Sequence, residues 1–286
     1  MIPTSFDYVR AGSVKEALNL LAVGDGSKVI AGGHSLLPMM RFRLVQTPRL
    51  IDISRIDELM GVQEYKKGVR IGATTTYADL ISSALLKERC PIVAEVAADI
   101  ADIQVRNRGT IGGSLAHADP ASDMPAVMLA LNAEFQLRSK KGGRRAVKAR
   151  DFFQGAFSTA MTEDELFTDI LIGGMGRNAA AYVSFDQLAS GYAMVGVCAV
   201  VGRKRSTISE ISVAYTGVGE AAFLSSSFEQ VNGTKCDAAA LQKAATEAVA
   251  ELQIGGDLHA PENYRRHIAA IAAVRAVEMA YERAGA

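Results

Sequence analysis

The stretch that decides the fold of this chain runs from Gly109 to Pro125 and reads GTIGGSLAHADPASDMP. It contains the contiguous glycines Gly112 and Gly113, with the hydroxyl side chains of Thr110 and Ser114 on either side. Paired glycines let a ligand approach the backbone closely and permit φ > 0, so that consecutive N–H groups can point at an anion. The stretch therefore predicts a loop that binds an anionic group, followed by the start of a helix.

A second loop of the same kind lies nearer the N-terminus. Its sequence AGGHSL, residues 31–36, follows directly after the apolar run KVI, residues 28–30. One such loop is a weak signal, whereas two in one chain indicate a ligand with a long phosphate bridge. Beyond the second glycine pair, Asp123 is a short carboxylate that could accept a hydrogen bond from a ribose or ribityl hydroxyl.

Composition and charge place the chain among ordinary globular proteins. Of its 286 residues, 49% are hydrophobic and 22% charged, and the 31 basic side chains balance the 31 acidic ones. No basic excess indicates a nucleic-acid partner. No secretory signal is visible, and no apolar run approaches the ~18 residues that a membrane span needs. We expect a cytoplasmic protein with no nucleic-acid partner and no integral membrane segment.

The spacing of cysteines and histidines indicates no metal site. Cys90, Cys198 and Cys236 stand far apart without a Cys-x-x-Cys motif, so we expect no iron–sulfur cluster and no structural zinc within this chain. The four histidines are not paired at ligand spacing. An odd number of widely spaced thiols fits a reducing compartment.

Apolar periodicity and turn residues predict a small β–α–β lobe, a middle segment and a C-terminal segment. Ser13 and Glu16 form a capping box at the first helix. The glycine cluster 173–176 indicates a boundary. We expect one domain over residues 1–176, with sub-lobes 1–54 and 55–176, and a second over 177–286. The predicted helices span 14–21, 36–44, 77–86, 91–98, 125–131, 225–231, 237–252 and 261–284, and the strands 28–31, 50–53, 60–65, 69–73, 134–138, 145–149, 166–172, 181–188, 192–202 and 208–216.

The familiar phosphate motifs are missing from the sequence. It contains no G-x-x-x-x-G-K-[ST] and no G-x-G-x-x-G after the first strand, which disfavours a P-loop ATPase and a Rossmann site. Instead, AGGHSL and TIGGS, with ADPASDMP after the second, resemble the FAD-binding medium subunit of molybdenum hydroxylases. Aerobic carbon monoxide dehydrogenase, bacterial N-heteroaromatic hydroxylases and xanthine dehydrogenase represent this family. The resemblance covers essentially the whole chain and does not specify the substrate.

The resemblance implies a fold and a set of cofactor contacts. The fold is α+β: a flavin-binding domain of the PCMH type, with a small α/β lobe and an antiparallel-sheet lobe, followed by a three-stranded sheet with helices. Residues 30–37 match the first FAD loop, whose N–H groups hold the pyrophosphate, and residues 110–114 match the second. No catalytic residue and no metal ligand is implied. The positions carried over as FAD contacts are Ile30, Ala31, Gly32, Gly33, His34, Ser35, Leu36, Leu37, Ile100, Thr110, Ile111, Gly112, Gly113, Ser114, Asp123, Leu166 and Tyr192.

Several of these positions have a second interpretation. Asp123 is expected near the sugar hydroxyls, Ile100 beside the flavin and Leu166 at the adenine end. Tyr192 matches an aromatic residue that covers one flavin face, although it stands in Ser-Gly-Tyr-Ala where the family often has Gly-Asp-Tyr-Ala. It could instead be an aromatic residue of a sheet core. His34 could anchor the flavin covalently, although this family holds FAD non-covalently.

The roles of five other residues near the loops are less specific. His117 is expected to be a hydrogen-bonding loop residue and not a catalyst. Arg41 and Arg43 could pair with FAD phosphates or lie on a solvated helix face or subunit contact. Asp99 and Asp102 could cap turns.

The resemblance implies an electron-transfer subunit. Substrate, either carbon monoxide or an N-heteroaromatic compound, would be oxidised at a molybdenum cofactor in a large partner chain. Electrons would pass through [2Fe-2S] clusters in a small partner chain to FAD here, and then to an external acceptor. The expected assembly is a dimer of heterotrimers. The alternatives are a stand-alone flavin-dependent oxidase and a non-enzymatic scaffold that binds no flavin.

Overall fold

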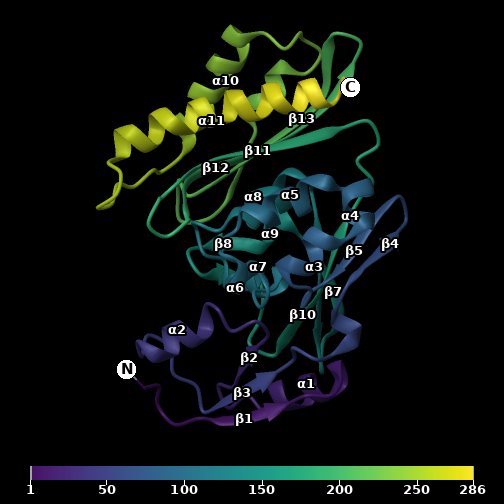
Figure 1. Ribbon diagram of the computed structural model, residues 1–286, viewed down its shortest axis with the longest axis vertical. Helices are drawn as coiled ribbons and strands as arrows, with labels where there is room; N and C mark the ends of the chain where they lie inside the picture. The colour runs from purple at the N-terminus through teal and green to yellow at the C-terminus, as the bar shows by residue number, and fades with distance from the viewer. Residues whose placement is uncertain (1, 286) are drawn as a thin grey trace.

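The computed structural model describes residues 2–285 and is elongated, with three regions stacked along its longest axis (Figure 1). The N-terminal region comprises residues 2–54, the middle region 55–176 and the C-terminal region 177–285. The first two regions carry the two glycine segments, and the third ends in the long helix α11 (Glu262–Arg283).

The N-terminal region is a three-stranded parallel sheet in the order β1-β3-β2. Ser13 Oγ accepts the N–H of Glu16 at 3.2 Å, whereas the Glu16 carboxylate accepts the N–H of Gly12 instead of that of Ser13. This cap starts α1, which buries Val14, Ala17 and Leu21. The predicted β–α–β arrangement is confirmed, with an additional first strand. The elements are β1 (Asp7–Arg10), α1 (Val14–Leu21), β2 (Lys28–Ile30), α2 (Leu36–Arg41) and β3 (Arg49–Asp52).

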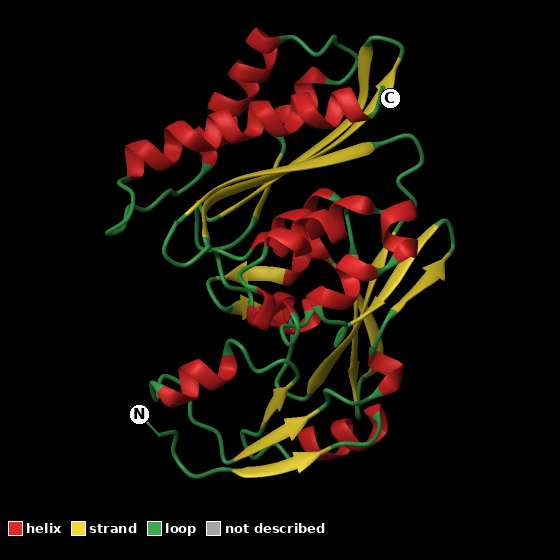
Figure 2. Ribbon diagram, in the orientation of Figure 1, coloured by secondary structure: helices red, strands yellow, loops and turns green. Residues whose placement is uncertain are grey.

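The middle region is an antiparallel five-stranded sheet in the order β4-β5-β10-β6-β7, with short helices packed beside it (Figure 2). Four phenylalanines form the centre of its core, since Phe135 lies 4.7 Å from Phe152 and 5.2 Å from Phe167, between ring centroids, with Phe153 adjacent. The strands are β4 (Val62–Tyr65), β5 (Gly68–Gly72), β6 (Glu134–Ser139), β7 (Gly143–Lys148), β10 (Glu165–Ile172) and a separate hairpin of β8 (Phe153–Gly155) and β9 (Ser158–Thr159).

One expected helix of the middle region is divided into two. One helix was expected over residues 77–86, but Ser83 has an extended conformation there (ψ 111°) and its side chain accepts the N–H of Leu86. Ser83 therefore ends one helix and begins the next. The helices are η1 (Asp57–Leu59), α3 (Tyr77–Ser82), α4 (Ala84–Arg89), α5 (Pro91–Asp99), α6 (Ile103–Arg106), α7 (Ile111–His117), α8 (Asp123–Ala130) and α9 (Ala149–Phe152).

The C-terminal region is an antiparallel sheet in the order β11-β12-β13-β14. The expectation of three strands is wrong, because residues 223–225 pair with 213–215 as a fourth strand where a helix start was expected. Alternation along β12 places Val197 and Ala199 in the core beneath the two long helices and Cys198 and Val200 in the core of the middle region. The elements are β11 (Ala179–Asp186), β12 (Ala193–Lys204), β13 (Thr207–Thr216), β14 (Phe223–Ser225), η2 (Ser227–Val231), α10 (Ala238–Glu251) and α11.

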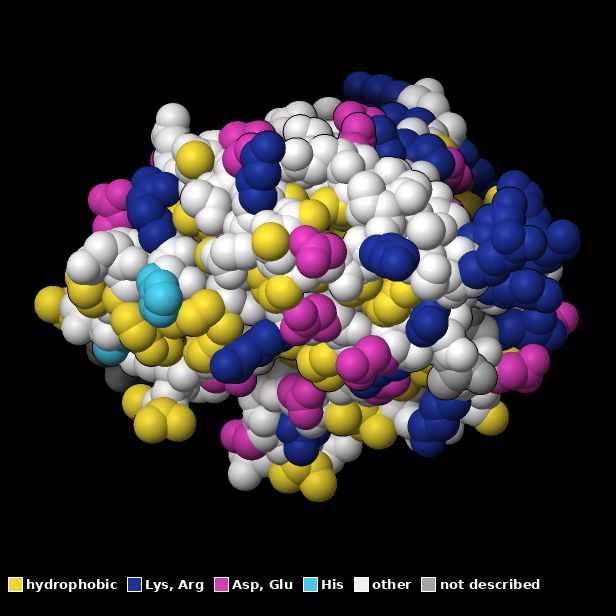
Figure 3. Space-filling model, turned by 90° about the horizontal axis from the view of Figure 1, so that it is seen from above, with side chains coloured by type: hydrophobic (Ala, Val, Ile, Leu, Met, Phe, Trp, Pro, Cys, Tyr) yellow, Lys and Arg dark blue, Asp and Glu magenta, His cyan; other side chains and the backbone are white. Residues whose placement is uncertain are grey.

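The face above α10 and α11 mixes charged and apolar side chains, and Lys and Arg gather on one side of it (Figure 3). This is an uneven distribution in a chain with equal numbers of basic and acidic residues. None of the described helices is long and apolar enough to cross a bilayer.

Truncation of Phe135 tests the core of the middle region. Phe135 is fully buried among the other aromatic rings, so Phe135→Ala should lower the free energy of unfolding by about 3–5 kcal/mol. Phe42→Ala, at a side chain that is 61% exposed, is the matched control and should change it by less than about 0.5 kcal/mol. Urea denaturation of the full chain measures both variants, and equal losses would contradict this account of the core.

Candidate cofactor-binding site

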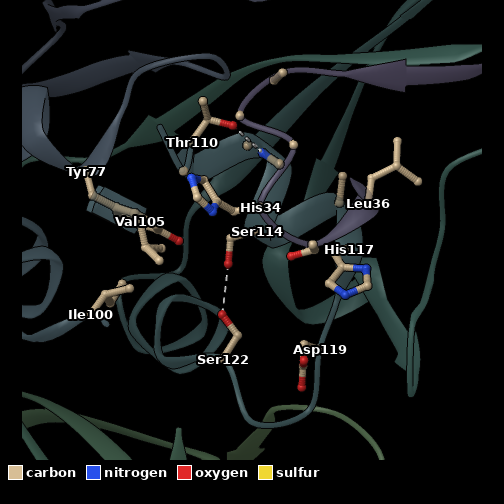
Figure 4. A pocket seen from close by; sticks show the side chains of 18 of the residues that line it. His34, Leu36, Tyr77, Ile100, Val105, Thr110, Ser114, His117, Asp119 and Ser122 are labelled. Carbon is tan, nitrogen blue, oxygen red and sulfur yellow. Dashed lines mark hydrogen bonds between the residues drawn. The ribbon is translucent and has the colours of Figure 1, made fainter. Parts of the chain in front are cut away.

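A cavity of about 790 Å³ lies where the three regions meet. Its walls come from the first glycine loop, from α7 with the segments before and after it, and from residues 186–192 of the C-terminal region. In the view of Figure 4, the His34 ring lies near Ser114 and points toward the side of Tyr77, Val105 and Ile100, whereas His117 lies on the other side, below Leu36. The volume lies within the ~300–1,000 Å³ of cofactor-sized sites.

Two glycines allow the backbone contacts that form this cavity. A Cβ on Gly32 would lie 2.1 Å from the carbonyl oxygen of Arg108, and a Cβ on Gly112 would lie 2.5 Å from Ala73 Cβ. Any side chain at either position would force the segments apart. Gly33 has φ +78°, a conformation that favours glycine.

The second glycine pair does not form a loop that presents N–H groups. Residues 111–117 are helix α7, capped by Thr110, whose Oγ1 accepts the N–H of Gly113. The N–H of Ile111 donates to Thr75 O at 3.1 Å and that of Gly112 to Ala73 O at 2.9 Å. The expectation that these N–H groups point at an anion is wrong, because the turn after β5 already supplies their acceptors.

In the first glycine loop, by contrast, the backbone N–H groups are not bonded to other parts of the protein that the structure describes. Within residues 2–285, the N–H groups of Gly32, Gly33, His34 and Ser35 have no protein acceptor. All four residues line the cavity. Unpaired N–H groups on successive residues of one loop can together bind an anionic group.

Asp123 lies in the first turn of α8 and lines the cavity. Its Oδ1 accepts a hydrogen bond from Tyr182 Oη of β11 at 2.5 Å. Burial raises the pKa of Asp123 to about 6, the Tyr182 bond opposes that shift, and the carboxylates of Asp186 and Asp99 reinforce it. Burial and Asp186 likewise raise the pKa of Asp99. The part of the cavity lined by Asp99, Asp123 and Asp186 is therefore acidic, and it favours ligand groups that donate hydrogen bonds, such as hydroxyls, over further anions.

A hydroxyl pair joins α7 to the segment before α8. Ser114 Oγ lies 2.8 Å from Ser122 Oγ, the contact drawn as a dashed line in Figure 4. Ser114, Ser122 and Asp123 all line the cavity, so this contact links α7 to the segment that carries Asp123.

The predicted site residues gather in one place with two exceptions. All of them line the cavity except Leu37, which is 40% exposed beside it, and Ile111, which is fully buried in the core. Tyr192 precedes β12 and is 51% exposed, so the alternative of a sheet-core aromatic residue is wrong.

The other residues that the sequence indicated have structural explanations. Asp102 caps α6 by accepting the N–H groups of Gln104 and Val105, which is the capping role expected from the sequence. Arg41 and Arg43 do not line the cavity, which disfavours their pairing with phosphates there. The ring of His117 packs 5.0 Å from that of Phe157, and burial lowers the pKa of His117. His117 lies in the last turn of α7 and not in a loop, and its expected hydrogen-bonding role stays a prediction.

Several lining residues were missed from the sequence. Tyr77 lies on α3, Asp186 ends β11, and Asp119 and Leu188 lie in connecting segments. Leu188 could have been predicted from the sequence, because it stands shortly before Tyr192 in the chain. Tyr77 could not, because it reaches the cavity only through the packing of α3 against Gly109. Within residues 2–285, no three His, Cys, Asp or Glu side chains are grouped to hold a metal ion.

Family models match both parts of the chain. Residues 4–172 match the FAD binding domain in molybdopterin dehydrogenase, and residues 180–280 match the CO dehydrogenase flavoprotein C-terminal domain. The chain is 41% identical to the carbon monoxide dehydrogenase medium chain of Hydrogenophaga pseudoflava, over 99% of each chain. It is 37% identical to the glyceraldehyde dehydrogenase medium chain of Sulfolobus acidocaldarius, over 96% of this chain and 98% of that one.

Solved structures agree with these matches. A carbon monoxide dehydrogenase structure from Hydrogenophaga pseudoflava superposes with a TM-score of 0.96 at 40% identity, covering 99% of each chain. Quinoline 2-oxidoreductase from Pseudomonas putida 86 superposes with a TM-score of 0.94 at 29% identity, also over 99% of each chain. The chain therefore belongs to the family of FAD-binding medium subunits of molybdenum hydroxylases, and it is the flavoprotein subunit of an oxidoreductase.

Proposed function

We propose that this chain holds one FAD non-covalently in the cavity and relays electrons from a partner chain to an external acceptor. The observation that carries the proposal is the set of unpaired N–H groups at Gly32, Gly33, His34 and Ser35. FAD carries an anionic pyrophosphate, which is the type of group that such donors bind.

The rest of the cavity fits the remainder of FAD. Gly113 is exposed on the cavity wall, so its lack of a side chain leaves room for the cofactor. The Asp123 carboxylate offers an acceptor to ribityl or ribose hydroxyls. Ile100 and Tyr192 offer apolar and aromatic surface for the flavin ring, and Leu166 is assigned to the adenine end. FAD supplies the redox chemistry, while these side chains bind and orient it.

The proposal extends to the assembly. Relatives named carbon monoxide dehydrogenase, nicotine 6-hydroxylase and caffeine dehydrogenase subunits support carbon monoxide or an N-heteroaromatic compound as the substrate of the complex. We assign the molybdenum cofactor to a large partner chain and [2Fe-2S] clusters to a small one, in a dimer of heterotrimers.

The domain boundaries and the location are part of the same proposal. Residues 1–176 form the FAD-binding domain and 177–286 the C-terminal domain, although Met1 and Ala286 lie outside the described residues. The odd number and wide spacing of the cysteines support a cytoplasmic location.

Substitution of Gly113 tests the FAD site. A Cβ at Gly113 would lie 2.7 Å from Thr110 Oγ1 and meet no other atom within 4 Å, so in Gly113→Val this one side chain has to turn aside and the added side chain should obstruct the cofactor. We expect the FAD dissociation constant to rise about ten-fold or more. Gly173→Val is the control, because Gly173 is exposed, has open space around it and lies away from this cavity. Wild-type FAD content and affinity in Gly113→Val would argue against the site.

The mode of attachment is tested by acid precipitation. Because His34 serves only as a backbone donor and cavity wall, all flavin should enter the supernatant, measured by its absorbance. His34→Ala should release flavin in the same way. Flavin that stays with the wild-type pellet but not with that of His34→Ala would establish a covalent anchor and revive the stand-alone oxidase.

The source of the electrons is tested on the native enzyme. Gentle purification should give FAD, molybdenum and iron in one species, and substrate should bleach its flavin. The isolated chain reconstituted with FAD should not bleach with substrate, whereas dithionite, the control reductant, should bleach both. A 30.3 kDa yellow species that is bleached by substrate without molybdenum or iron would refute the relay function.

A further inference from the structure

A side chain of the C-terminal region reaches into the wall of the FAD cavity. Tyr182 lies in β11, beside Cys198 in the register of the sheet, and its hydroxyl donates to Asp123 Oδ1 at 2.5 Å. Within the described residues, Asp123 Oδ2 has no side-chain or backbone donor. One carboxylate oxygen of this cavity-lining residue is thus held by the protein, while the other has no donor among the described residues.

The same sheet also fixes the segment that leads to Asp123. Thr216 Oγ1 lies 2.8 Å from Pro120 O and 2.7 Å from Ser122 O, and the N–H of Gly217 donates to Pro120 O at 2.8 Å. Thr216 is fully buried. The backbone before α8 is therefore held from β13, and the carboxylate at its start is held from β11.

Gly196 makes room for both of these contacts. It lies on β12 between the two strands, and a Cβ there would lie 2.0 Å from Tyr182 Oη and 2.8 Å from Thr216 Cγ2. Only a glycine at this position lets the hydroxyl and the threonine methyl group occupy their places together.

We propose that Tyr182 is a positioning residue for FAD, which orients the Asp123 carboxylate toward a cofactor hydroxyl and makes FAD binding depend on the C-terminal sheet. The inference rests on the proposed contact between Asp123 and FAD. A tyrosine hydroxyl restricts the carboxylate to one rotamer, so less conformational freedom is lost when the cofactor binds.

The test compares Tyr182→Phe with Tyr215→Phe in the full chain, purified with its accompanying chains and stripped of FAD. Tyr182→Phe should raise the FAD dissociation constant about ten-fold, followed by flavin fluorescence. Tyr215 is the matched control, because it lies in β13 of the same sheet and its buried hydroxyl has no partner in the described structure. Tyr215→Phe should leave FAD affinity unchanged. Gly196→Ala, which displaces the Tyr182 hydroxyl without deleting it, should weaken FAD binding as Tyr182→Phe does.

The Asp123→Asn variant separates this inference from the proposed function. If Tyr182 acts through Asp123, Tyr182→Phe should have little further effect in the Asp123→Asn background. An Asp123→Asn variant with wild-type affinity would overturn the contact between Asp123 and FAD itself. Weak binding in Asp123→Asn with normal binding in Tyr182→Phe would overturn only the role of Tyr182. A ten-fold effect that persists in the double variant would show a general structural role and also overturn it.

The pH profile gives a second readout that a purely structural role would not move. Tyr182, Tyr77, Tyr192, Asp99 and Asp186 surround the Asp123 carboxylate. Protonation of Asp123 removes the charged acceptor, so wild-type FAD binding should weaken as the pH falls through the region of its pKa, about 6. Loss of the Tyr182 donor disfavours the ionised form, so this midpoint should move to higher pH in Tyr182→Phe. The transition should disappear in Asp123→Asn, and an unmoved midpoint in Tyr182→Phe would contradict the proposal.

Discussion

The cofactor site depends on a direct contact between two backbone segments from different regions. Gly32 lies against the carbonyl of Arg108 so closely that a Cβ would lie 2.1 Å from its oxygen. A second close contact brings Gly112 against Ala73, where a Cβ on the glycine would lie 2.5 Å from Ala73 Cβ. The two contacts set the distance between the first loop and α7, and thereby the width of the cavity. Side chains in either place would widen it and separate the unpaired N–H groups from the opposite wall.

The C-terminal region packs against the middle region and also positions residues of the cofactor site. Alternation along β12 sends one set of side chains into the core beneath α10 and α11, and the other into the core of the middle region. The sheet is thereby held rigidly against α8. Because of this, Tyr182 and Thr216 can hold Asp123 and its preceding backbone at fixed positions. The cavity is a product of three regions, and none of them encloses it alone.

The two glycine pairs have similar sequences but different backbone environments. Both pairs indicated an anion site, and all but two of the predicted residues line a single cavity. The two pairs nevertheless act differently. The N–H groups of Ile111 and Gly112 bond to Thr75 and Ala73, which fold back from the end of β5, whereas those of the first loop meet no such acceptors. A motif indicates which backbone can approach a ligand, but the neighbouring chain decides whether its donors remain free.

The sequence by itself determined the class of the fold, the family, and the segments that build the cofactor site. The family and its flavin-binding fold follow from the resemblance carried by the two glycine segments and the stretch after the second, whereas local elements such as α1 follow from short-range chemistry, namely capping by Ser13 and apolar periodicity. Only the tertiary structure decided that Ser83 divides one expected helix into two, that a fourth strand joins the last sheet, and that Tyr182 bonds to Asp123. Each of these depends on groups far apart in sequence or on one residue's backbone angle, and neither leaves a periodic signal in the chain.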